Sequence, residues 1–162
     1  MKKLCIFLLS LAAFGISNVS AEQSTYSKPG SLSAQAGLGL YWGHYDGLDI
    51  EGGVDLGLVQ VPFANVLPID FGVSGRVGLG IGAWGGLSVG AFGTAHYSWK
   101  ALGAKLDWLN RLESYLAIGV QILPGLNLDG YGGNAYHIDQ NFAVFYEGGY
   151  HASVLGVSYK FN

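Results

Sequence analysis

The chain has 162 residues, of which 50 % are hydrophobic and only 12 % are charged. An average soluble domain carries roughly 25 % charged residues, so much of this surface is expected to face something other than water. The formal net charge of −3 argues against nucleic acid as a partner. The 27 glycines come without the Pro, Gln and Ser bias that is typical of disordered chains. The length suits one domain.

The first residues are typical of a secretory signal peptide, predicted over 1–21. Two lysines precede an apolar run over 4–16, and cleavage is expected between Ala21 and Glu22. Cleavage would remove two of the 8 basic residues and leave 6 against 11 acidic ones, a net charge of −5. Cys5 lies inside the signal, so the remaining chain is expected to have no disulfide and no cysteine metal site.

The uncharged stretch over 77–95 decides between a transmembrane helix and strands. Its length alone suits a membrane-spanning helix. However, large and small residues alternate with period two, and its glycines would each cost a helix about 1 kcal/mol. The stretch therefore predicts a hairpin with a glycine-rich turn.

The same alternation recurs along the chain and predicts an all-β protein, an eight-stranded antiparallel up-and-down transmembrane β-barrel. An even strand count places both termini on one side, expected to be periplasmic. Residues 22–30 are expected to form a short polar segment before a barrel over 31–162. The strands are expected over 31–42, 48–61, 67–81, 86–100, 112–122, 130–138, 142–149 and 152–161.

The two faces of these strands differ in kind. One carries Leu, Ile, Val and aromatic residues, and the other carries mainly Gly, Ser and Ala with single charges. Small side chains suit a narrow barrel interior, because they let the far wall approach. Asp55 and Arg76 are expected at comparable depth on adjacent strands. The predicted lumen charge network comprises Asp49, Glu51, Asp55, Asp70, Arg76, His96, Lys100, Glu113, Glu147 and Lys160.

This network has two interpretations. In the favoured one, the charges neutralise one another in a fixed plug, since eight strands leave little more than the space that side chains fill. The protein would then be mainly structural, with minor small-solute passage. In the other, Arg76 and its acidic neighbours form the constriction of a narrow channel for small polar or amphipathic solutes, where carboxylates favour cations.

Aromatic residues gather near the expected strand ends, as in the interfacial girdles of membrane barrels. The expected outer connections 43–47, 82–85, 123–129 and 149–151 are short, which disfavours binding of a large outer partner. The expected outer girdle comprises Trp42, Tyr45, Trp84 and Tyr150, and the inner one Phe63, Trp99, Trp108, Tyr159 and Phe161.

The end of the chain has the most specific pattern. Gly156 is followed by aromatic residues at the alternating positions Tyr159 and Phe161. This resembles the C-terminal insertion signal of the small bacterial outer-membrane β-barrels, the OmpA/OmpX/OmpW-like group. The stretch 139–147 is similar to their tight periplasmic turn and penultimate strand. Family members usually finish on the aromatic residue itself, whereas Asn162 follows here.

The resemblance implies a Gram-negative outer membrane as the location and outer-membrane lipid as the surroundings. It implies periplasmic chaperones and the barrel-assembly machinery as partners during biogenesis. A monomer without enzymatic activity and without a cofactor is expected.

His151 and Ser153 suggest a third, disfavoured function. They lie two residues apart on one strand face, similar to the histidine and serine of an outer-membrane lipid A deacylase. Such a pair also needs an acid and an oxyanion hole. Glu147 alternates to the opposite face, and His96 with Ser98 repeats the spacing without a better third partner. The four histidines are too scattered to predict a metal site.

Overall fold

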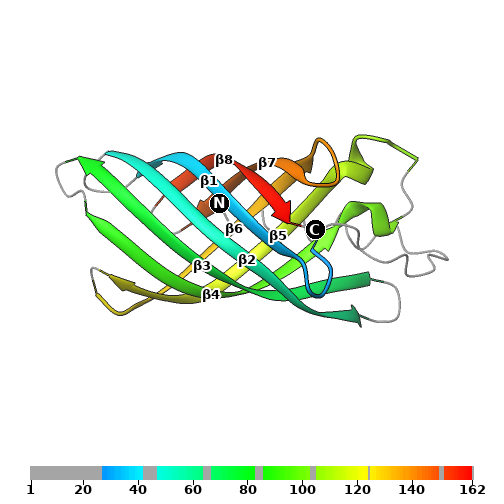
Figure 1. Ribbon diagram of the computed structural model, residues 1–162, viewed down its shortest axis with the longest axis horizontal. Coiled ribbons are helices and arrows are strands. Elements are labelled where there is room, and N and C mark those ends of the chain that lie inside the picture. Colours follow the sequence, from blue (N-terminus) through cyan, green and yellow to red (C-terminus); the bar gives the residue numbers. More distant parts are fainter. Residues whose placement is uncertain are drawn as a thin grey trace, which may run out of the picture.

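The computed structural model describes residues 27–41, 47–63, 67–82, 86–102, 105–123, 125–149 and 152–161. Within these ranges eight antiparallel strands close into a barrel in chain order, with β8 pairing back to β1 (Figure 1). The predicted fold is therefore confirmed. The strands are β1 (Leu32–Tyr41), β2 (Gly47–Phe63), β3 (Leu67–Gly82), β4 (Leu87–Ser98), β5 (Leu112–Leu123), β6 (Asn127–His137), β7 (Phe142–Gly149) and β8 (Ala152–Phe161).

The barrel is apolar outside and polar inside. On β3, Ser74 and Arg76 are buried, whereas the alternating Val73 and Val77 are exposed. β5 shows the same arrangement of buried polar and exposed apolar side chains, since Glu113 is buried and Ile118 is 75 % exposed. Period-two alternation produces this arrangement, because successive side chains of a strand point to opposite faces.

The observed strand boundaries lie within three residues of the predicted ones, and the differences at β4 and β6 bear on the lumen. β4 ends at Ser98, and a 3₁₀ helix, η1 (Trp99–Leu102), follows. A second 3₁₀ helix, η2 (Leu109–Arg111), precedes β5, and η1 and η2 lie beyond the barrel at the end where β8 finishes (Figure 1). β6 begins at Asn127, three residues earlier than predicted, because residues 127–129, which the prediction placed in the connection 123–129, pair with β5.

A register shift in β2 lies between Gly57 and Val59. Leu58 and Val59 are consequently both exposed on the outer face, so the predicted alternation breaks at this point. The backbone of Gly57, which pairs with Gly72 of β3 on one side, pairs with the segment before β1 on the other. Gly30 N–H donates to Gly57 O at 2.8 Å, and Gly57 N–H donates to Ser31 O at 2.9 Å. The chain before β1 is thereby held at the inner end of the barrel, which is the end where β1 begins and β8 finishes.

Within the described ranges, no helix is long and apolar enough to cross a membrane.

Candidate functional site in the barrel lumen

Arg76 is the central residue of the lumen. Its cross-strand neighbours are glycines on both sides, Gly53 on β2 and Gly90 on β4. A Cβ at Gly53 would come within 2.5 Å of Arg76 Cδ, so the glycine leaves the space that the arginine side chain occupies. The glycine-rich inward face therefore allows one long side chain to reach across the lumen.

The guanidinium of Arg76 is paired on several sides. It donates to Glu147 Oε1 at 3.1 Å and Oε2 at 3.4 Å, and to Glu51 Oε1 at 3.0 Å. Its carbon atom Cζ lies 4.5 Å from the ring centroid of Tyr131, whose hydroxyl accepts from Nε at 3.0 Å. Tyr115 donates to Glu147 Oε2 at 2.6 Å. We call these five residues, Arg76, Glu51, Glu147, Tyr115 and Tyr131, the Arg76 layer.

The Arg76 layer lies between two cavities. The inner cavity has a volume of about 60 Å³ and the outer one about 120 Å³, and Arg76 and Tyr131 line both. The outer cavity is lined by Asp49, Glu51 and Asp129, whereas Asp55, His96 and Lys160 line the inner one. One layer of side chains thus separates two polar spaces that each hold only a few waters.

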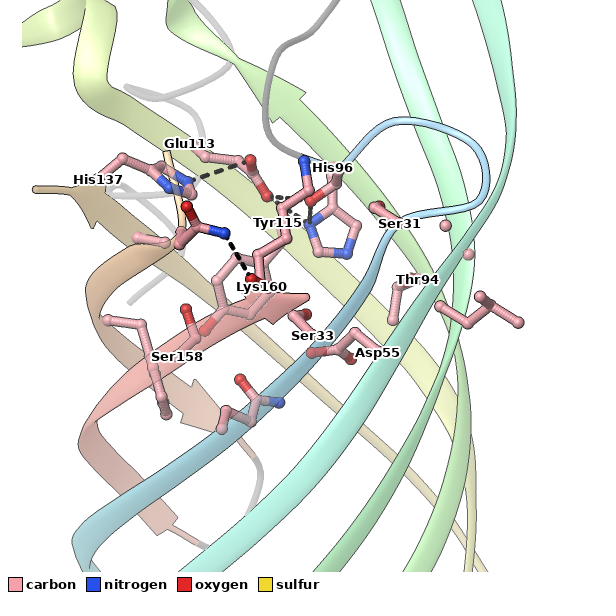
Figure 2. A pocket seen from close by; sticks show the side chains of 18 of the residues that line it. Ser31, Ser33, Asp55, Thr94, His96, Glu113, Tyr115, His137, Ser158 and Lys160 are labelled. Atoms are coloured by element: carbon pink, nitrogen blue, oxygen red, sulfur yellow. Dashed lines mark hydrogen bonds and ion pairs between the residues drawn. The ribbon is translucent and has the colours of Figure 1, made fainter. Parts of the chain in front are cut away.

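A second polar group, the inner cluster, lies at the inner end of the lumen (Figure 2). It consists of Glu113 with three partners. His96 Nδ1 lies 2.7 Å from Glu113 Oε1, and His137 Nε2 lies 3.4 Å from Oε2. Ser27 Oγ donates to Glu113 Oε1 at 2.7 Å. Because Ser27 precedes β1, the cluster ties the segment before the barrel to β4, β5 and β6.

The structure brings five of the ten residues of the predicted charge network into contact with one another. Arg76 contacts Glu51 and Glu147, and His96 contacts Glu113. Asp55 pairs in register with Ser74 rather than with Arg76, which lies two residues nearer the outer end. Asp49 and Asp70 are buried, and Lys160 lines the inner cavity.

Lys100 does not belong to this network. The prediction placed it on the inward face of a strand over 86–100, but β4 ends at Ser98 and Lys100 lies in η1. Among the described residues, no group of three or more His, Cys, Asp and Glu side chains could hold a metal ion.

The residues of the hydrolase hypothesis are described only in part. His151 lies outside the described residues, and the Ser153 hydroxyl lies 3.0 Å from the Tyr146 hydroxyl.

Two other predictions also fall outside the described residues. These are the cleavage site, Ala21 and Glu22, and the outer girdle, Trp42, Tyr45, Trp84 and Tyr150.

The C-terminal pattern occupies the inner half of β8. Gly156 is buried and faces inward, and Tyr159 and Phe161 are exposed. The rings of Tyr159 and Phe161 meet edge to face at 5.4 Å. Tyr159 pairs with Ala34 and Phe161 with Leu32, so this end of β8 seals the barrel against β1.

The sequence analysis did not predict that His137 contacts Glu113 or that Tyr131 contacts Arg76. Both lie on β6, whose glycine-rich sequence hid the alternation. Counting in steps of two from Ala135, back to Tyr131 and forward to His137, would have placed both residues on the inward face.

The comparisons with known proteins show the fold. No family model and no curated protein matches the chain. Among solved structures it is similar to a de novo designed transmembrane β-barrel, with a TM-score of 0.63 and 18 % identity over 84 % of this chain and 99 % of that one. It is also similar to the outer membrane protein Ail of Yersinia pestis, with a TM-score of 0.45 and 12 % identity over 82 % of this chain and 99 % of that one.

Proposed function

We propose that the protein is a monomeric integral outer-membrane β-barrel whose main role is structural. The outward apolar face around the closed barrel carries this proposal. The side chains of Leu38, Val77 and Ile118, on β1, β3 and β5, are each more than half exposed. A surface of this kind is unfavourable in water and favourable against lipid tails.

The lumen supports a mainly structural role. The charges of the Arg76 layer are buried and paired, and the side chains of Arg76 and Glu147 are 7 % and 4 % exposed. Buried ion pairs of this kind are rigid, since breaking one leaves an uncompensated charge. The proposal includes recognition of β8 by the barrel-assembly machinery after delivery by periplasmic chaperones, which the alternation over 156–161 supports.

Insertion can be tested directly. The chain without residues 1–21 should fold only with detergent or lipid, and should show different gel migration before and after heating. It should also resist protease in liposomes. A chain that stays soluble and monomeric without detergent would contradict the proposal.

A narrow channel for small polar solutes is the second candidate, because a single layer of side chains separates the two cavities. If the role is structural, planar-bilayer recordings of the wild type should show no discrete openings. If the protein is a channel, the wild type should show discrete openings, and Arg76→Ala should alter them. Gln121→Ala, in the wall of the outer cavity but outside the Arg76 layer, is the control. The double variant Arg76→Gln with Glu147→Gln removes both charges and covers the case in which Arg76→Ala does not fold.

A further inference from the structure

The segment before β1, residues 27–31, has two unlike faces at the inner end of the lumen. Ser27 and Ser31 line the inner cavity, whereas residues 28–30 are exposed. One side of the segment therefore forms part of the cavity wall, and the other side faces away from the lumen. We call residues 27–31 the strap.

The strap is bonded to the opposite wall of the barrel. Ser27 Oγ donates to Glu113 Oε1 at 2.7 Å and lies 3.3 Å from His96 Nδ1. Glu113 lies on β5, which is four strands from β1 in either direction around the closed barrel. Figure 2 shows Ser31, His96 and Glu113 at the same end of the inner cavity. The strap and the inner cluster together therefore cross the inner mouth of the lumen.

Gly57 of β2 provides the space in which the strap lies. Gly30 N–H donates to Gly57 O at 2.8 Å, and Gly57 N–H donates to Ser31 O at 2.9 Å. A Cβ at Gly57 would have strap atoms as its three nearest neighbours, with Ser31 Oγ at 2.9 Å and Ser27 O at 3.0 Å. A larger residue at this position would therefore push the strap away from the wall.

Few hydrogen bonds hold the strap in place. Within the described ranges, its backbone bonds to the barrel are the two at Gly57, and Ser27 adds the side-chain bond to Glu113. Its remaining backbone bond is local, from Ser31 N–H to Lys28 O at 3.0 Å. Segments held by few bonds open locally at a fraction of the free energy of global unfolding. The strap can therefore lift while the barrel, whose strands are paired on both sides, stays folded.

We infer that the strap is the inner gate of the lumen. When it is seated, it closes the inner cavity toward the end where β8 finishes. When it lifts, the cavity opens at that end, while the Arg76 layer still separates it from the outer cavity. A solute that crosses the lumen therefore meets two barriers in series. The inference rests on the proposed membrane barrel and deepens its candidate channel function.

The test measures access to the inner cavity with a cysteine reporter. Cys5 is the only cysteine, so the chain without residues 1–21 has none. Thr94→Cys places a thiol in the wall of the inner cavity, at a position that is 5 % exposed. Ser88→Cys places one in the wall of the outer cavity as a reference. The rate at which a cationic methanethiosulfonate modifies each thiol is measured on the barrel refolded in detergent.

Two test variants release the strap by different routes. Ser27→Ala removes the bond to Glu113, and Gly57→Ala puts a methyl group where the strap lies. Each has a matched control. Ser27→Thr keeps the hydroxyl, and Gly93→Ala adds a methyl group where the nearest atom is 3.8 Å away.

The Thr94→Cys thiol should react slowly in the parent chain and in both controls. It should react about fivefold faster with Ser27→Ala, and also faster with Gly57→Ala. The Ser88→Cys thiol should react at the same rate in every background. Equal rates for Thr94→Cys in test and control variants would overturn the inference. An equal acceleration at Ser88→Cys would overturn it too, because it would show general loosening of the barrel. Heat-modifiable migration of the parent chain tests the barrel separately, so a failed gate is distinguishable from a failed barrel.

Discussion

Arg76 on β3 and Glu147 on β7 form a two-point ion pair across the barrel lumen, with N–O distances of 3.1 and 3.4 Å. The two strands lie on different walls of the barrel and share no backbone pairing. The ion pair therefore braces the barrel through its interior, in addition to the hydrogen-bonded ladder around its circumference.

Glu147→Gln should destabilise the barrel more than Glu51→Gln. Glu147 contacts Arg76 at two points and also accepts from Tyr115, whereas Glu51 makes one contact and its side chain is 19 % exposed. Loss of the buried partner is expected to cost about 3 kcal/mol for Glu147 and about 1 kcal/mol for Glu51. Urea unfolding of the inserted barrel measures both values, and an equal or larger cost for Glu51→Gln would refute the assignment.

Ser27→Ala should loosen the segment before β1. The Ser27 hydroxyl donates to buried Glu113, and its removal should cost about 1 kcal/mol. Protease should then cut the chain before β1 faster than in the wild type, with the barrel itself still resistant. Ser33→Ala, at the wall of the inner cavity, is the control and should leave cleavage unchanged. Equal cleavage of both variants would show that Ser27 does not hold the segment.

Asp139 in the β6–β7 turn should make stability depend on pH. The backbone N–H groups of Asn141 and Phe142 each donate to its Oδ1 at 2.8 Å, which lowers the pKa of this carboxyl in the folded state. Its stabilising contribution is therefore complete above the unfolded-state pKa of about 4 and is lost as pH falls through the lower folded-state value.

The check is the urea midpoint of wild type and Asp139→Ala as a function of pH. The variant should have a lower midpoint at neutral pH, and the two curves should converge in acid, below about pH 4. A difference that stays constant from neutral to acidic pH would mean that the carboxylate charge does not contribute.

Gly119→Ala should destabilise the barrel, and Gly93→Ala should not. A Cβ at Gly119 would lie 2.6 Å from the backbone Cα of Phe92 on the neighbouring strand, whereas at Gly93 the nearest atom is 3.8 Å away. Overpacking against backbone is expected to cost about 1–3 kcal/mol. Thermal unfolding of both variants in detergent compares them, and a neutral Gly119→Ala would contradict the close approach of β4 and β5.

Truncation before Tyr159 should abolish assembly. Tyr159 pairs with both Ala34 of β1 and Phe142 of β7, so its loss opens the inner end of the seam. An open sheet edge is unfavourable in lipid, because its backbone groups find no partner. Heat-modifiable migration in membranes measures assembly, and normal insertion of the truncated chain would refute this role of β8.

The sequence predicted the strands well where large and small residues alternate without interruption. The prediction over 142–149 matches β7, and that over 152–161 matches β8. It failed where the strand ends early, as before Lys100 in η1, and at the start of β6, where residues expected in a connection pair with β5. The shift between Gly57 and Val59 was also missed, because nothing in the local pattern distinguishes a bulge from continued alternation.

The sequence by itself determined the fold class and the face to which most charged side chains point, because period-two alternation is a local property of a strand. Only the tertiary structure decided which charges meet. Arg76 contacts Glu147 rather than Asp55, and Glu113 gathers His96, His137 and Ser27. These pairings depend on the register and closure of eight strands, and residues distant in the chain come within hydrogen-bonding distance only when the barrel closes.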